Sequence, residues 1–248
     1  MSLLSPSDPP PFEVIGADSR APVLLVCDHA SKRVPAALGD LGLPPGRIEE
    51  HIGWDIGAAA VTRRLAPMLD ATAVLCGYSR LVIDCNRDPS DPSSIPAESD
   101  GVAIPANASL TPADRAARID EIFRPYHGAV ARHLAAKSAP AFISIHSFTP
   151  VMQGFARPWH CGILWDDDPR IAVPLMAALG SEAHLTVGDN QPYSARDPVG
   201  YTVEHHAQRV GMPHVAIELR QDLVASEAGA AEWAVRLAAA LGSVLRSL

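Results

Sequence analysis

The sequence predicts an α/β fold: a single three-layer α/β/α domain with a mixed, mostly parallel central sheet. Short, uniformly apolar runs are typical of strands buried on both faces, and amphipathic segments alternate with them. The 248 residues are 48 % hydrophobic and 19 % charged, which provides enough apolar surface for a core. No internal repeat or linker is visible. We therefore expect one domain over residues 1–248, with residues 1–20 as a proline-rich lead-in.

The N-terminal half predicts strands at residues 21–27, 71–76 and 81–85 and a helix over 56–69. The last two strands are joined by four residues, which is short enough for a hairpin, and a hairpin would make the sheet mixed. Residues 88–110 hold four prolines and little periodicity. They predict a long loop, and such loops are usually functional or disordered.

The C-terminal half begins with Thr111 and Pro112, which favour a helix start because Thr caps it and Pro suits its first turn. Further strands are expected at 141–145, 161–165 and 213–217, and further helices at about 169–179, 201–210 and 226–245. Residues 190–200 are polar, hold two prolines and predict another loop.

The formal net charge of −8 argues against a nucleic-acid partner, which needs a basic face, but allows a local basic pocket for a small anion. No signal peptide is evident, and no run reaches the ~18 apolar residues of a membrane span. The four cysteines form no C-x-x-C pair, which favours buried, reduced thiols in a cytoplasmic protein. The sequence does not indicate an oligomeric state.

Ionisable residues stand at the ends of three predicted strands: Asp28–His29, His146 and Glu218. Ligands of open α/β sheets bind beyond the carboxyl ends of the strands, where residues distant in sequence converge. Two histidines and an acid are usual ligands of a catalytic zinc, and His29 and His146 supply the imidazoles. The acid is Asp28 or Asp55, although neighbours at a strand end face opposite ways, which disfavours Asp28 beside His29. The alternatives are a helix N-cap for Asp55 and structural roles for both histidines.

Glu218 is the candidate general base, because zinc lowers the pKa of water toward ~7 and a nearby carboxylate can take its proton. A salt bridge to Arg220 is the alternative. Alternation along the strand, however, places Glu218 on the same face as Ala216 and not on the face of the apolar residues beside it. Asn86 and Arg87 follow a predicted strand, and arginine holds a carboxylate through two parallel hydrogen bonds. This pair is a candidate anchor for the α-carboxylate of an amino-acid substrate, and a surface ion pair explains it equally well.

Five segments carry a resemblance to a known family: Cys27-Asp-His-Ala-Ser31 with Pro35, His51-Ile-Gly-Trp-Asp55, Arg80-Leu-Val-Ile-Asp-Cys-Asn-Arg87, Ile145-His-Ser147 and Ile217-Glu-Leu-Arg220. In this order they resemble the N-formylglutamate amidohydrolases, over roughly residues 22–222. The resemblance implies a fold similar to zinc carboxypeptidases and one Zn²⁺ ion, with another divalent metal as the alternative. It assigns the metal to His29, Asp55 and His146, the base to Glu218 and the substrate carboxylate to Asn86 and Arg87. The family hydrolyses N-formyl-L-glutamate to formate and glutamate, late in histidine degradation, so the expected partner is a small N-acyl amino acid.

Two departures from the family pattern affect the substrate more than the reaction. Asp28 stands where an apolar residue or proline is expected, and residues 190–201 contain one glycine where the family is glycine-rich. We expect this loop to shape the acyl or side-chain pocket, with Arg196 either binding a second carboxylate or simply solvated. The alternatives are a metallopeptidase or cell-wall amidase of similar fold and a non-catalytic binder of acidic metabolites. The absence of an export signal and wall-binding repeats disfavours the wall enzyme, and a binder has little need of Glu218 facing a metal.

Overall fold

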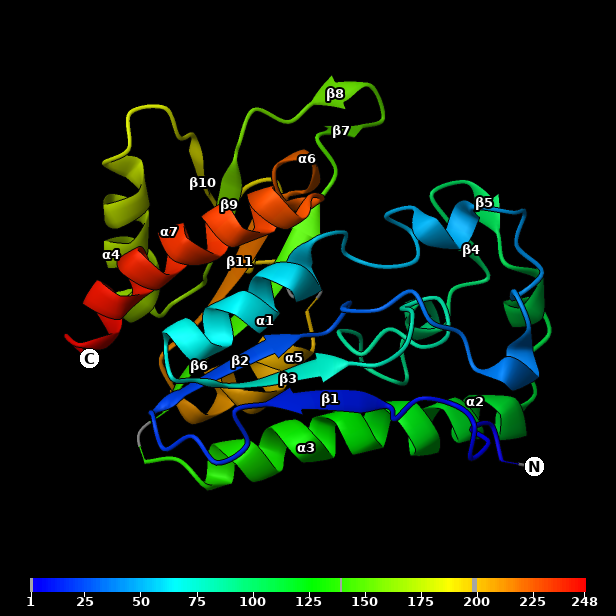
Figure 1. The fold of residues 1–248 in the computed structure, drawn as a ribbon. Helices are drawn as coiled ribbons and strands as arrows, with labels where there is room; N and C mark the ends of the chain where they lie inside the picture. The colour runs from blue at the N-terminus through cyan, green and yellow to red at the C-terminus, as the bar shows by residue number, and fades with distance from the viewer. Residues whose placement is uncertain (1, 139, 198–199) are drawn as a thin grey trace.

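The computed structural model describes residues 2–138, 140–197 and 200–248, and a seven-stranded sheet runs through it (Figure 1). In spatial order the strands are β1 (Phe12–Ile15), β3 (Thr72–Cys76), β2 (Val23–Cys27), β6 (Ala141–Phe148), β11 (His214–Arg220), β9 (Cys161–Leu164) and β10 (Val187–Asp189). Strands β3, β2, β6 and β11 are mutually parallel, whereas β1 and β9 run antiparallel to their neighbours β3 and β11. The predicted mixed, mostly parallel sheet is confirmed.

Helices cover both faces of the sheet, as predicted (Figure 1). One face carries α1 (Ala58–Met68), α4 (Pro169–Gly180), α6 (Gln221–Val224) and α7 (Glu227–Leu245). The other carries α3 (Arg124–Ala135) and α5 (Thr202–His206), with α2 (Pro112–Arg118) leading into α3 through the π-helical turn η5 (Ile119–Phe123). Short 3-10 turns and two small hairpins complete the chain: η1 (Ala36–Leu38), η2 (Arg47–Glu49), η3 (Pro92–Ser94), η4 (Pro105–Asn107), η6 (Gln208–Val210), β4 (Glu98–Ser99) with β5 (Val102–Ala103), and β7 (Val151–Met152) with β8 (Phe155–Ala156).

Strand β2 is apolar throughout because each of its faces lies in a separate core. Its odd-numbered residues, such as Leu25, join a core with α1, α4 and α7, while Leu24 and Val26 join a second core with α3. Side chains alternate along a strand, so a strand between two helical layers needs apolar residues at every position. The same alternation in β6 and β11 decides which residues reach the site.

Side-chain caps fix the starts of three helices. Thr111 and Asp114 form a capping box at α2, and the carboxylate of Asp168 accepts from the N–H of Arg170 at α4. The hydroxyl of Ser226 accepts from the N–H of Gly229 at α7. By length and composition α7 is apolar enough to cross a membrane, contrary to the expectation that no segment is. In the fold it packs against α1 and α4 as a core helix.

One of the strand expectations is wrong, and with it the expected hairpin. Residues 81–85 form turns rather than a strand, and their apolar side chains are buried in the core beneath α3. The predicted hairpin therefore does not exist, and the antiparallel neighbour of β3 is β1. Strand β1 lies within the expected lead-in and pairs at the edge of the sheet, where the prolines that precede it are tolerated.

Candidate active site

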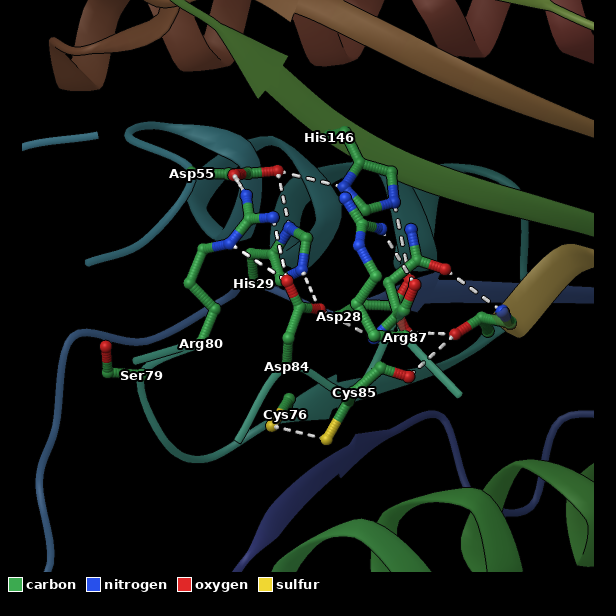
Figure 2. A network of polar contacts seen from close by, with 12 residues as sticks. Asp28, His29, Asp55, Cys76, Ser79, Arg80, Asp84, Cys85, Arg87 and His146 are labelled. Atoms are coloured by element: carbon green, nitrogen blue, oxygen red, sulfur yellow. Dashed lines mark hydrogen bonds and ion pairs between the residues drawn. The ribbon is translucent and has the colours of Figure 1, made fainter. Parts of the chain in front are cut away.

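Three predicted ligands meet at the carboxyl edge of the sheet, although they come from distant parts of the chain (Figure 2). His29 follows β2, Asp55 lies in the turn before α1, and His146 lies near the end of β6. One ligand atom from each lies within 4.8 Å of the others, and all three residues are buried. Oδ2 of Asp55 lies 2.9 Å from Nδ1 of His146 and 3.3 Å from Nδ1 of His29. Such a set suits a tetrahedral catalytic zinc, which takes three protein ligands and keeps one position open.

Backbone contacts hold Asp55 in this place. Its N–H donates to the carbonyl of His29 at 3.0 Å, and its Oδ2 accepts from the N–H of Ser147 at 3.2 Å. The N-cap of α1 is Gly57, with φ 84°, and no side chain caps this helix. Asp55 is therefore not the helix cap that was the alternative to a ligand.

The nitrogen of His29 that faces away from Asp55, Nε2, is held by Asp84, a residue to which the sequence assigned no role. Nε2 of His29 lies 2.7 Å from Oδ1 of Asp84. The other oxygen of Asp84 accepts hydrogen bonds from Nε and Nη2 of Arg80, at 3.1 and 2.8 Å. NH1 of Arg80 also lies 3.6 Å from Oδ1 of Asp55. Arg80 thus places a positive charge beside two of the buried carboxylates.

The outer nitrogen of His146 is held by Asp28 and Ser144. Nε2 lies 3.0 Å from Oγ of Ser144 and 3.3 Å from Oδ2 of Asp28. Asp28 is therefore outside the three-residue cluster and behind one of its members. The side chain of Asp28 lies on the α3 side of the sheet, like those of Leu24 and Val26, as alternation along the strand requires.

Charges within the cluster shift the pKa values of its members. Burial opposes ionisation of Asp28 and Asp55, but the neighbouring histidines outweigh it, lowering the pKa of Asp28 to about 2 and that of Asp55 well below its usual value. Burial also opposes the charge on His146, yet hydrogen bonds with Asp28 and Asp55 raise its pKa well above 6.5. The pKa of His29 is raised as well, since Asp84 and Asp55 overcome burial and the repulsion of Arg80.

Glu218 is the exception, because its carboxylate is buried without a hydrogen-bond partner for Oε2 among the described residues. It lies on β11 directly opposite His146 of β6 in the parallel register, and the parity that it shares with Ala216 places both in the wall of one cavity. Burial, reinforced by the negative charge of Asp55, raises the pKa of Glu218 to about 7 even though His146 opposes the rise. Arg220, the alternative partner, pairs with Asp222 instead.

Gly162 makes room beside Glu218. It is the cross-strand partner of Glu218 on β9, and a Cβ there would lie 1.9 Å from the carbonyl oxygen of Gln191. No ordinary side chain fits at that distance. The close approach sets the start of the loop that carries Tyr193 and Arg196 over the site.

The candidate substrate residues line the same cavity of about 1090 Å³ as the metal cluster and Glu218. Oδ1 of Asn86 accepts a hydrogen bond from the N–H of Thr202 at 3.0 Å, which fixes the side-chain amide in the cavity wall. NH1 of Arg87 donates to the carbonyl of Asn86 at 2.9 Å. Arg196 is exposed, and its guanidinium lies 5.3 Å from the ring centre of Trp165. The expected loop at 88–110 also contributes to the wall, with Ser93, Pro96 and residues 98–100.

Comparisons with known proteins identify the family of this chain. A family model described as N-formylglutamate amidohydrolase matches residues 21–225. A solved structure of a gene product of Agrobacterium tumefaciens is 39 % identical with a TM-score of 0.93, covering 99 % of this chain and 98 % of that one.

Two more distant structures share the fold. An N-formylglutamate amidohydrolase from Ralstonia eutropha is 18 % identical with a TM-score of 0.71, and the match covers 96 % of this chain and 97 % of that one. A bacteriophage poly-gamma-glutamate hydrolase is 10 % identical with a TM-score of 0.52, and the match covers 97 % of this chain and 91 % of that one. A comparison with curated protein sequences finds no match. Since the family model covers most of the chain, this protein belongs to the N-formylglutamate amidohydrolase family.

Proposed function

We propose that this amidohydrolase cleaves the amide bond of an N-formyl or other N-acyl amino acid, such as N-formyl-L-glutamate, with one zinc ion held by His29, Asp55 and His146. The observation that carries the proposal is the position of Glu218. A buried carboxylate oxygen without a hydrogen-bond partner is costly, and Oε2 of Glu218 has none among the described residues. Glu218 also lies beside three potential ligands, and its pKa is raised to about 7.

The residues of the cavity have different roles in amide hydrolysis. Bound zinc supplies Lewis acidity, which activates water and polarises the carbonyl. The carboxylate of Glu218 accepts the proton of the attacking water and returns it to the leaving amine, a transfer that a carboxylate near pKa 7 performs in both directions. Arg80 lines the cavity beside Asp55, where its positive charge stabilises the negative charge that develops on the carbonyl oxygen.

Asn86 and Arg87 are proposed to bind the α-carboxylate of the substrate, and Arg196 a second carboxylate. All three line the cavity that holds Glu218, and guanidinium groups are suited to carboxylates in an otherwise acidic protein. With a formyl substrate the products are formate and the free amino acid.

The size of the cavity favours a wider range of acyl groups as a second candidate. Its volume of about 1090 Å³ lies just above the ~300–1,000 Å³ that usually holds a drug-sized ligand, and N-formylglutamate is smaller than such a ligand. N-acetyl and N-succinyl amino acids therefore deserve the same assay as the formyl compound.

The decisive experiment combines metal analysis with a hydrolysis screen of the purified protein. We expect about one zinc per chain and release of free amine from N-formyl, N-acetyl or N-succinyl derivatives of aspartate, glutamate or glutamine. The matched variant Glu218→Gln should keep the zinc and lose turnover, which separates an enzyme from a metal-dependent binder. Full activity in that variant would remove Glu218 from the mechanism, and wild-type protein that binds no zinc would remove the metal site.

A further inference from the structure

Asp28 is a buried carboxylate that the proposed reaction does not use. It follows β2 directly, and its side chain is fully shielded from solvent. A buried charge is costly unless other groups pair with it, so its contacts indicate what the residue does.

Three neighbouring elements direct polar groups at this one carboxylate. Oδ1 accepts hydrogen bonds from the hydroxyls of Tyr126 on α3 and Thr202 on α5, both at 2.8 Å. Oδ2 faces β6, where Oγ of Ser144 donates at 3.4 Å and Nε2 of His146 lies 3.3 Å away. The two hydroxyls fix Oδ1, and therefore the carboxylate can present Oδ2 only to β6.

The two nitrogens of His146 face in opposite directions (Figure 2). Nδ1 lies 2.9 Å from Oδ2 of Asp55, within the proposed metal cluster, while Nε2 faces Asp28 and Ser144. A neutral imidazole carries one proton, and the partner of one nitrogen decides whether the other can act as a ligand. An anion behind Nε2 keeps the proton there and leaves the lone pair of Nδ1 directed into the cluster.

We propose that Asp28 is a positioning residue that fixes the ring and tautomer of His146 for metal binding. The inference rests on the proposed metal site. It also links that site to the substrate loop, because Thr202 begins α5 directly after the loop that carries Arg196, and the N–H of Thr202 donates to Asn86.

The test is the zinc affinity of the full chain, measured by competition with a chromogenic chelator, in wild type and in Asp28→Asn. Asparagine keeps the shape and the acceptor for Tyr126 and Thr202 but removes the anion behind Nε2. We expect affinity about 10–100-fold weaker, the usual effect of losing an outer partner of a ligating histidine. The visible spectrum of the Co²⁺-loaded variant should shift at the same time, because the orientation of one ligand changes. Asp168→Asn, at a buried aspartate that caps α4, is the matched control and should bind zinc as wild type does.

The outcomes separate this inference from the proposed metal site. Wild-type protein without zinc affinity would remove both, whereas equal affinities in wild type and Asp28→Asn would overturn only the role of Asp28. If Asp28→Asn does not fold, Thr202→Val removes one hydroxyl that holds the carboxylate and leaves the charge. Zinc affinity weakened in Thr202→Val, with a shifted Co²⁺ spectrum, supports the proposal, and a wild-type affinity and spectrum in that variant contradict it.

Discussion

The buried carboxylate of Glu218 should reduce the stability of the metal-free fold, so Glu218→Gln is expected to stabilise the protein while abolishing its activity. Glu218 is 7 % exposed, and its pKa is raised from 4.5 to about 7. A carboxyl whose pKa is higher in the folded than in the unfolded state favours folding when protonated. The unfolding free energy therefore falls as the pH rises above the unfolded pKa, and the full penalty applies above the folded pKa. Glutamine is neutral at every pH and avoids the penalty.

The size of the effect follows from the two pKa values. A shift from 4.5 to about 7 corresponds to a penalty of about 3 kcal/mol near pH 8 and of about 1 kcal/mol near pH 5. Glu218→Gln should raise the unfolding free energy by these amounts at the two pH values. Such an exchange of stability for activity is expected of an active-site residue.

Urea unfolding of the metal-free proteins, followed by circular dichroism near pH 8 and pH 5, measures the difference. Glu232→Gln is the control, because Glu232 is exposed on α7, and its unfolding free energy should stay within ~0.5 kcal/mol of wild type. The reasoning is refuted if Glu218→Gln is no more stable than wild type near pH 8, or if its advantage does not depend on pH.

Further predictions concern the metal, the substrate, the pH profile and the loop. Asp55→Ala should weaken zinc binding by more than about 100-fold in chelator competition, because losing a ligand exceeds the about 10–100-fold effect of losing an outer partner; unchanged affinity would exclude Asp55 as a ligand. Arg87→Lys should raise KM about tenfold with little change in kcat, because lysine cannot form paired hydrogen bonds with a carboxylate. An unchanged KM would show that Arg87 does not bind the substrate carboxylate. The rate should rise with pH as Glu218 loses its proton, with a midpoint below about 7 because a bound cation lowers that pKa, and a flat acid limb argues against this base. Gly162→Ala should displace Gln191 and the loop that follows it, which lowers the activity, the melting temperature and, by about 1–3 kcal/mol, the unfolding free energy. A wild-type melting curve would show that the loop can move without a loss of stability.

The strands that carry the site could be predicted because their signal is local. Strands β2, β6 and β11 are short apolar runs that end near ionisable residues, and alternation alone placed Glu218 on the face of Ala216. Residues 81–85 show the limit of this signal. An apolar run indicates burial, but the N–H groups of Val82 and Asp84 bond to Ser79 and Ser94 across turns, and tertiary contacts of this kind leave no periodic pattern.

The outer partners of the histidines were missed because they follow no local rule. Each imidazole lies between two carboxylates: His29 between Asp84 and Asp55, and His146 between Asp28 and Asp55. Alternation disfavours Asp28 and His29 as ligands of one ion, because consecutive residues face opposite ways. The same alternation turns Asp28 toward the α3 face of the sheet, where His146 arrives from the neighbouring strand. An acid beside one proposed ligand in sequence thus contacts the other proposed ligand in space, and only the pairing of β2 with β6 reveals which one.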